Sequence, residues 1–338
     1  MFTQYGHKVF SLGTFHDPNK PANHLRQGRP EFYNEELLER FVALDGHNDL
    51  RRVPLNFSRY FDVVIVNHFP EWVRFNLEAF GDTPVILRSI GQSSSAIERD
   101  YNALGDRVKI IRYSNTEVNK PGFAKTHGVI YFSKFKEDYE IWSGGDAGLT
   151  FQNDFCSRTE YATPNLQEWR TIHDASNCRL FGRNNEDVGE SSGLAPAEDM
   201  SNLLRRAAFY LYVYTRPPSY HLSVMEALMA GTPVLAPSAK LIASKASMAD
   251  KWDDGYTDAW TEDRYEVPSF LAEGAGLTYD TAEEGASLAK MLHEKPDLAA
   301  GYSARGRQRA IEKFDAATII TQWNDLFEKI CASVSANV

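Results

Sequence analysis

One acidic side chain interrupts a helix that should otherwise be apolar. Residues 220–230 read YHLSVMEALMA, and Leu222, Met225 and Leu228 recur there at helical spacing, which predicts a buried face. Glu226 directly follows Met225. A buried carboxylate without partners is costly, whereas a carboxylate that accepts hydrogen bonds from a polyol such as ribose is satisfied. The competing interpretation is a solvent-exposed glutamate on an amphipathic helix.

The segments around this helix indicate how it is positioned. Residues 211–214 and 234–236 are short runs of β-forming apolar residues, and they predict strands before and after the helix. Pro217 and Pro218 precede the helix and Gly231 follows it, as is typical of helix ends. The sequence therefore predicts a strand, helix, strand unit.

Composition limits the classes of protein that this chain can be. At 338 residues it is long enough for two domains, and 43% apolar with 24% charged residues is typical of a globular protein. Its net charge of −10, without a run of lysine or arginine, argues against nonspecific binding to nucleic acids or anionic membranes. A local basic cleft remains compatible with these numbers.

Cysteine use and hydropathy concern the cellular setting. Cys156, Cys178 and Cys331 are an odd number of cysteines at no metal-ligand spacing, which favours a reduced, cytoplasmic setting. Because the sequence has no metal-ligand spacing, we expect no metal site. We also expect no stable membrane insertion, because no apolar run approaches the roughly 18 residues that a membrane span needs.

Strand and helix patterns alternate along the whole chain. Apolar runs in the first half predict strands at residues 61–68, 83–88, 108–113 and 129–133, and those in the second half at 149–155, 178–183, 211–214, 234–236 and 276–279. This alternation indicates two doubly wound α/β domains. A glycine cluster at residues 144–148 suits a linker between them, and a last helix with one apolar stripe is expected near the end.

The central segment also carries a family resemblance. Residues 214–238, YTRPPSYHLSVMEALMAGTPVLAPS, resemble the donor-site segment of GT-B glycosyltransferases of the group 1, family 4-like type. That family usually has two glutamates eight positions apart; here Pro218 occupies the first position and Glu226 the second. The resemblance implies two Rossmann-like domains facing a central cleft. It also implies that Glu226 binds the ribose hydroxyls of a nucleotide, while the missing first glutamate leaves the sugar open.

The resemblance extends to the domain layout. It implies an acceptor domain over residues 1–145, a nucleotide-sugar donor domain over 146–315, and a final helix over 316–338 that crosses back to the first domain. Residues 6–13, GHKVFSLG, resemble the GHEV-type second strand of the first domain. Only five residues precede this segment, so the first strand is expected to be missing.

Donor-binding groups are expected at the carboxyl ends of the second domain's strands, where ligands bind in open α/β sheets. The start of the central helix offers main-chain N–H groups and a positive dipole end to the diphosphate, over Ser219, Tyr220, His221 and Leu222. Arg158 and Arg183 each follow a predicted strand and are candidate cations for the leaving diphosphate, although exposed surface charges are an equal alternative. Arg216 is a weaker candidate.

The first domain is expected to hold the acceptor. By resemblance, His68 at the end of a buried strand contacts the transferred sugar and is the catalytic candidate; without the family, a histidine satisfied by a backbone carbonyl would be favoured. Acceptor-side residues are expected at Arg88, Gly91, Gln92 and Ser93. A retaining reaction needs no protein base and an inverting one does, and the sequence leaves both possible.

The predicted activity is metal-independent transfer of a hexosyl or pentosyl group from a nucleotide-diphosphate sugar to an acceptor hydroxyl. The nucleotide sugar is a substrate, so no cofactor is expected. The acceptor is left open among a glycan, a small molecule and a modified DNA base. Two alternatives stand beside this function: a phage-type DNA base glycosyltransferase and a noncatalytic sugar-nucleotide-binding homologue. A dinucleotide-dependent enzyme would need a glycine fingerprint, and none is visible.

Overall fold

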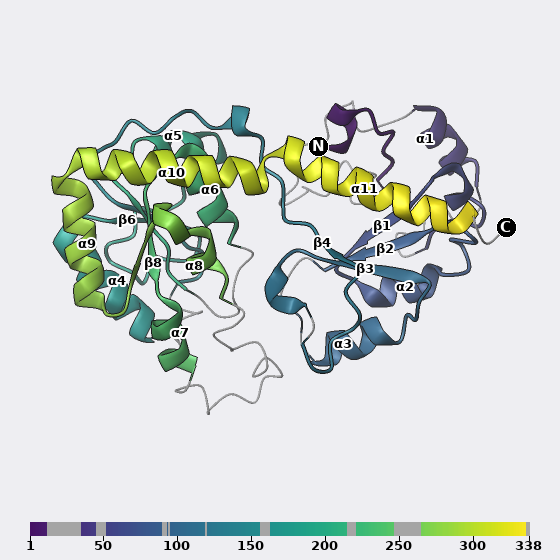
Figure 1. Ribbon diagram of the computed structural model, residues 1–338, viewed down its shortest axis with the longest axis horizontal. Helices are drawn as coiled ribbons and strands as arrows, with labels where there is room; N and C mark the ends of the chain where they lie inside the picture. Colours follow the sequence, from purple (N-terminus) through teal and green to yellow (C-terminus); the bar gives the residue numbers. More distant parts are fainter. Residues whose placement is uncertain are drawn as a thin grey trace.

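A computed structural model gives the fold of the chain. It describes residues 1–11, 35–44, 52–89, 93, 95–118, 120–155, 163–214, 221–246 and 265–335. Two α/β lobes lie side by side in Figure 1, and a pair of consecutive long helices runs across both of them.

The first lobe is built on a four-stranded parallel sheet with strand order β1-β2-β3-β4. The strands are β1 (Val64–Asn67), β2 (Val85–Arg88), β3 (Val108–Arg112) and β4 (Gly128–Val129). Val64 pairs with Val85, and Val85 with Val108, so the β-branched residues of the apolar runs align across the sheet. Its helices are α1 (Glu35–Val42), α2 (Pro70–Asn76) and α3 (Ser95–Asn102).

The second lobe carries a five-stranded parallel sheet with strand order β6-β5-β7-β8-β9. The strands are β5 (Leu149–Phe151), β6 (Arg179–Phe181), β7 (Tyr210–Leu211), β8 (Val234–Pro237) and β9 (Leu277–Tyr279). The helices of this lobe are α4 (Thr163–Ser176), α5 (Met200–Arg205), α6 (Leu222–Ala230), α7 (Ala239–Ala246), α8 (Val267–Phe270), α9 (Ala282–Glu294) and α10 (Pro296–Phe314). Two doubly wound α/β units are therefore present, as the alternation of patterns predicted.

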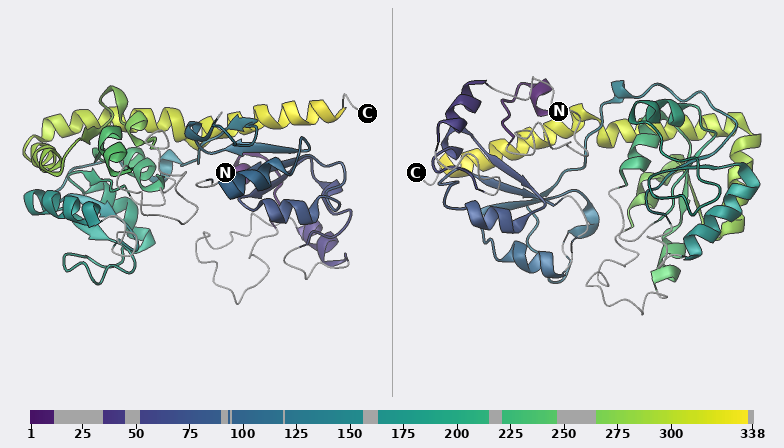
Figure 2. Two further views of the ribbon diagram at one scale, coloured as in Figure 1. Left: turned by 90° about the horizontal axis from the view of Figure 1, so that it is seen from below. Right: turned by 180° about the vertical axis from the view of Figure 1, so that it is seen from behind.

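The last helix, α11 (Ala316–Ser335), lies on the first lobe. Asp315 separates it from α10 with extended backbone angles (φ −61°, ψ 142°). Trp323 of α11 is buried, and its ring packs against the guanidinium of Arg88 and the ring of Phe2. In each view α11 extends along the first lobe (Figures 1 and 2). The crossing helix that the resemblance implied is thus present.

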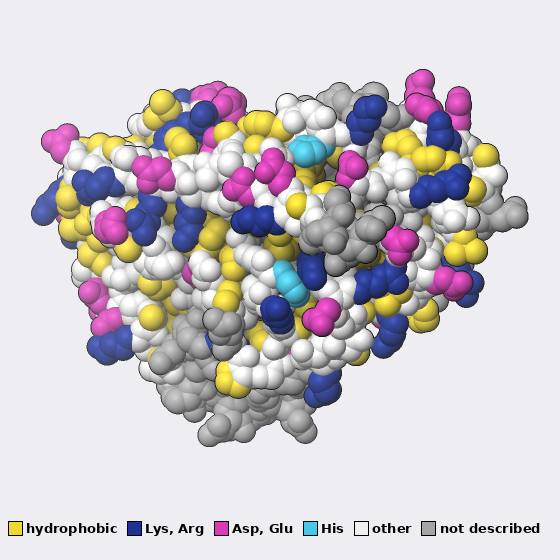
Figure 3. Space-filling model, turned by 45° about the vertical axis from the view of Figure 1, so that its right-hand side comes forward, with side chains coloured by type: hydrophobic (Ala, Val, Ile, Leu, Met, Phe, Trp, Pro, Cys, Tyr) yellow, Lys and Arg dark blue, Asp and Glu magenta, His cyan; other side chains and the backbone are white. Residues whose placement is uncertain are grey.

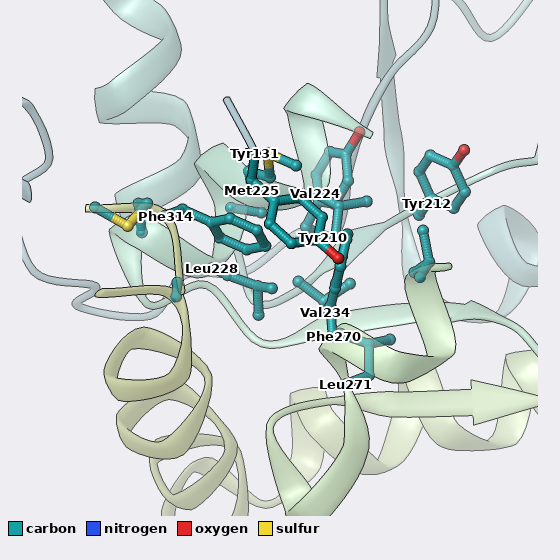
Figure 4. Close-up of a cluster of buried hydrophobic side chains, with 14 of the residues drawn as sticks. Tyr131, Tyr210, Tyr212, Val224, Met225, Leu228, Val234, Phe270, Leu271 and Phe314 are labelled. Carbon is teal, nitrogen blue, oxygen red and sulfur yellow. The ribbon is translucent and has the colours of Figure 1, made fainter. Parts of the chain in front are cut away.

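The largest apolar core joins the two lobes. It combines Ile86 and Ile111 of the first sheet with the buried face of α6 and with residues of α11. Figure 4 shows its centre, where Met225 and Leu228 lie near Phe314 at the end of α10. The lobes are therefore packed together through side chains as well as through the connecting chain.

One predicted strand is wrong. Residues 6–11 of the expected strand over 6–13 form none, and the rest of that segment lies outside the described residues. Instead, Phe2–Tyr5 form a 3₁₀ helix that ends at Gly6 in the left-handed region (φ 88°). The rings of Phe2 and His7 pack against Phe327 of α11, so tertiary contacts with the last helix override the local strand pattern. The domain bounds at residues 145 and 315 stay predictions.

Candidate functional site

The helix α6 positions the glutamate that the sequence singled out. It begins after His221, which is left-handed (φ 56°, ψ 24°), and ends at left-handed Gly231 (φ 79°). Because α6 follows β7, its first turns lie at the carboxyl edge of the second sheet, where ligands bind in open α/β sheets. Met225 and Leu228 are buried, whereas the Glu226 side chain keeps 23% of its surface exposed.

The carboxylate of Glu226 forms a salt bridge with Lys134. Lys134 belongs to the segment between β4 and β5 that connects the two sheets, and 17% of its side chain is exposed. No motif in the sequence singled out this lysine as a site residue. Its one sequence signal is its position directly after the strand predicted at residues 129–133.

His221 has a different role from the one its place at the helix start suggests. Its ring is buried, and Nδ1 lies 2.9 Å from the hydroxyl of Tyr212 in a hydrogen bond. The rings of Tyr265 and Phe270 lie near it, and burial lowers the pKa of His221 to about 4. The imidazole is therefore neutral at physiological pH, and a predicted donor contact at this residue would use the main chain.

Leu222 and Arg183 are the remaining donor-side candidates that the structure describes. Leu222 is the first residue of α6 and is half-buried against the shared core. Arg183 follows β6, an edge strand, and it has an exposed side chain and a main-chain N–H that donates to Asn153 Oδ1 (2.9 Å). Arg158, Arg216, Ser219 and Tyr220 lie outside the described residues.

On the first lobe, His68 directly follows β1, an edge strand of the described sheet. Its backbone is left-handed (φ 73°), and its N–H donates to the carbonyl of Arg88 (2.9 Å). The Arg88 guanidinium donates to the carbonyls of Ile130 and Tyr131 and stacks over Phe132. Burial lowers its pKa to about 10. Arg88 thus links β2 to the connecting segment through these hydrogen bonds. Its contact with an acceptor stays a prediction.

Ser93 is held by a buried cluster of charges at the carboxyl edge of the first sheet. Its N–H donates to Glu117 Oε1 (3.2 Å), and its hydroxyl donates to Glu98. Arg112 is fully buried between these acids, with two hydrogen bonds to Glu98 (2.6 and 2.8 Å). The cluster fixes the position of Ser93. Gly91 and Gln92, the neighbouring candidates, lie outside the described residues.

A second polar connection joins the lobes near the carboxyl ends of β3 and β4. Glu266, which precedes α8, accepts hydrogen bonds from Ser114 Oγ (2.5 Å) and from the Tyr131 hydroxyl. Lys313 of α10 lies over the Tyr131 ring at 4.7 Å, and burial lowers the pKa of Lys313. Tyr131 and Lys313 line a pocket of about 390 Å³, together with Asn115. No sequence signal pointed to Glu266.

Surface and metal-binding features set further limits. On the face shown in Figure 3, basic and acidic side chains are interspersed rather than gathered into one basic stripe. Within the described part of the chain, no group of three or more histidine, cysteine or acidic side chains is arranged to hold a metal ion. None of the described helices is long and apolar enough to cross a membrane.

Comparisons with known proteins show which family and which solved structures the chain resembles. Residues 163–325, slightly less than half of the chain, match the family model described as glycosyl transferase-like. This match includes α6 and Glu226. The two parallel α/β units and the crossing final helix show the GT-B fold that the sequence resemblance predicted, and solved structures share this fold. No curated protein matches significantly.

Solved structures share the fold at low sequence identity. Sucrose-phosphate synthase from Thermosynechococcus elongatus is 15% identical, with a TM-score of 0.59 over 94% of this chain and 87% of that chain. HepE of Anabaena, in complex with UDP, is 14% identical, with a TM-score of 0.58 over 80% of each chain. TarM is 12% identical, with a TM-score of 0.51 over 78% of this chain. The match covers only 54% of the longer TarM chain.

Proposed function

We propose that this chain transfers a sugar from a nucleoside-diphosphate sugar to an acceptor hydroxyl, and that the second lobe holds the donor. The observation that carries the proposal is Glu226. It is a partly exposed carboxylate at the carboxyl edge of a parallel sheet, and it lies within the segment that matches the glycosyl transferase-like family. Ligands of open α/β sheets bind at this edge.

The chemistry of α6 suits a nucleoside diphosphate. A carboxylate accepts hydrogen bonds from two ribose hydroxyls, and such charge-assisted bonds are stronger than neutral ones. The start of α6 presents main-chain N–H groups and the positive end of the helix dipole, which favour a diphosphate. We assign the ribose to Glu226 and the diphosphate to the main chain around His221 and Leu222, with Arg183 as a candidate cation for the leaving group.

The donor base and the metal requirement are part of the proposal. UDP and UDP-glucose are bound in solved structures of HepE, so UDP is the first nucleotide to test and a hexosyl group the first sugar. We propose metal-independent transfer, in which the helix start and protein cations neutralise the leaving diphosphate. Undiminished turnover in a chelator would support this mechanism, and turnover that needs an added divalent cation would contradict it.

The acceptor side is assigned to the first lobe. His68, which follows β1, is the candidate for contact with the transferred sugar, and Arg88, Gly91, Gln92 and Ser93 are the acceptor-side candidates. Acceptors of carbohydrate or small-molecule type with a free hydroxyl are the first to test. Replacing His68 with Ala should lower turnover while UDP affinity is retained, because His68 is assigned to the sugar and not to the nucleotide.

Nucleotide binding to the purified protein tests the central assignment. A ligand at about 100 times its dissociation constant adds roughly 2.7 kcal/mol of stability, so millimolar UDP should raise the melting temperature even if it binds weakly. Calorimetry should then show that Glu226→Gln lowers UDP affinity about tenfold or more. The matched control is Glu283→Gln, an exposed glutamate in the first turn of α9. Equal UDP affinity of Glu226→Gln and wild type would overturn the ribose assignment.

A further inference from the structure

We infer that Lys134 is a positioning residue for the donor: it orients the Glu226 carboxylate toward the ribose and couples that carboxylate to the junction between the lobes. This inference rests on the proposed function, because it assumes that Glu226 binds a nucleotide. It adds a residue from outside the donor lobe and outside the segment that matches the family.

The main chain of Lys134 is fixed at the point where α10 gives way to α11. Its N–H donates to the carbonyl of Phe314, the last residue of α10, at 2.8 Å. Its carbonyl accepts from the N–H of Ala316, the first residue of α11, also at 2.8 Å. The main chain of Lys134 therefore binds the residues on both sides of Asp315, the extended residue between the two helices. Any change in the angle between α10 and α11 would move Lys134 with it.

The neighbouring residues strengthen this anchor. The N–H of Lys136 donates to Asp315 Oδ1 (3.2 Å), and Asp315 is buried. Arg307 of α10 donates to the carbonyl of Met229 near the end of α6, and it reaches the carbonyls of Lys136 and Tyr139 at 3.4 Å. The connecting segment, α6 and the α10–α11 junction thus form one hydrogen-bonded unit, in which Lys134 makes the contact with Glu226.

The side chain of Lys134 contacts one oxygen of the carboxylate. Its ammonium group is bound to Glu226 Oε1, while 23% of the Glu226 side chain remains exposed. An ammonium group in this position holds the carboxylate in one rotamer and leaves Oε2 available to ribose hydroxyls. Without it, the flexible glutamate would have to lose rotamer freedom on binding, which reduces affinity.

A double-mutant cycle on UDP affinity tests whether Lys134 acts through Glu226. We expect Lys134→Met to weaken UDP binding by up to about tenfold, because the freed Glu226 side chain must then be immobilised on binding, and Lys134→Arg to retain most of the affinity. In the Glu226→Gln background, Lys134→Met should cause little further loss, because the group on which it acts is already changed. A purely structural lysine would lower the melting temperature without this dependence on Glu226.

The control is Lys136→Met, which removes a nearby, more exposed lysine with the same charge. If general attraction to the anionic nucleotide explained the effect, Lys136→Met would weaken binding similarly and the inference would be overturned. Wild-type affinity in Lys134→Met, or equal losses in both backgrounds, would also overturn it while leaving the Glu226 assignment intact. If Lys134→Met does not fold, Lys134→Gln serves in the same cycle. Failure of wild type to bind any nucleoside diphosphate would instead overturn the proposed function.

Discussion

The hydroxyl of Tyr131, just beyond the last strand of the first sheet, donates a hydrogen bond to the carboxylate of Glu266 in the second lobe. Ser114 donates to the other carboxylate oxygen at 2.5 Å, and Asn115 donates to the Tyr131 oxygen at 3.1 Å. Glu266 and Tyr131 are both buried. A buried carboxylate is tolerated only when hydrogen bonds satisfy it, so these hydroxyls connect the lobes and also stabilise a charge.

Tyr131→Phe should therefore destabilise the protein by about 1–2 kcal/mol. The substitution keeps the ring contacts with Phe270 and Phe314 but removes one of the donors to Glu266. Urea unfolding would measure the change. Tyr302→Phe is the control, since its ring would still pack against Arg305 in α10 and its stability should stay near that of wild type. Equal stabilities of Tyr131→Phe and the control would show that Glu266 does not depend on this hydroxyl.

Arg112→Met should have a much larger effect. Its guanidinium has no exposed surface, and it lies 2.6 Å from Glu98 and 3.6 Å from Glu117. Removing the cation would leave two carboxylates buried together, which typically costs about 3–5 kcal/mol. Thermal unfolding and soluble yield would both fall. Arg99→Met, at an exposed position on α3, should cause little change. A stable Arg112→Met protein would mean that these carboxylates take up protons or water at little cost.

Gly231→Ala tests the end of α6. Gly231 is left-handed (φ 79°), and an added Cβ would lie 3.1 Å from Ser303 Oγ. An alanine there should reduce stability by about 1–2 kcal/mol, since both the backbone and the neighbouring side chain must adjust. Gly189→Ala is the matched control because no atom lies within 4 Å of its added Cβ. Chemical denaturation would compare the two, and equal midpoints would contradict the expected strain.

Local patterns were enough to predict the secondary structure near the candidate site. The helix around Glu226 and its glycine end follow from helical periodicity and from the conformational freedom of glycine, and both were confirmed. The apolar run that ends at His68 likewise predicted β1. These features depend on residues close together in the sequence, which is why one sequence reveals them.

The polar contacts between the lobes could not be predicted in this way. Lys134 and Glu226 are 92 residues apart, and Ser114 and Glu266 are 152 apart. Their pairing depends on how two sheets and a crossing helix pack, and residue type and spacing do not encode that packing. The predicted strand is absent over residues 6–11 for the same reason, because Phe2 and His7 pack against a helix more than 300 residues away in the sequence.

The last prediction concerns acid stability and the buried imidazole of His221. Burial lowers the pKa of His221 to about 4 in the folded state, while an unfolded histidine titrates near about 6.5. Between these values the unfolded chain binds a proton that the folded chain does not, so stability falls as the pH decreases from about 6.5 to about 4. The shift corresponds to about 3 kcal/mol once the pH lies below both values. Above pH 6.5 this residue should contribute no pH dependence.

His221→Asn should remove this dependence. Asparagine tolerates the left-handed backbone at this position, and its amide does not titrate, so the variant should lose less stability than wild type between pH 6.5 and pH 4. Its stability at pH 7.5 should be somewhat lower, because the ring contacts with Tyr265 and Phe270 are lost. The measurement is the free energy of unfolding in urea at several pH values. His173→Asn, a partly exposed histidine on α4, is the control. If His221→Asn and wild type lost equal stability on acidification, the imidazole would have to be protonated in the folded state, and the hydroxyl of Tyr212 would then accept its hydrogen bond.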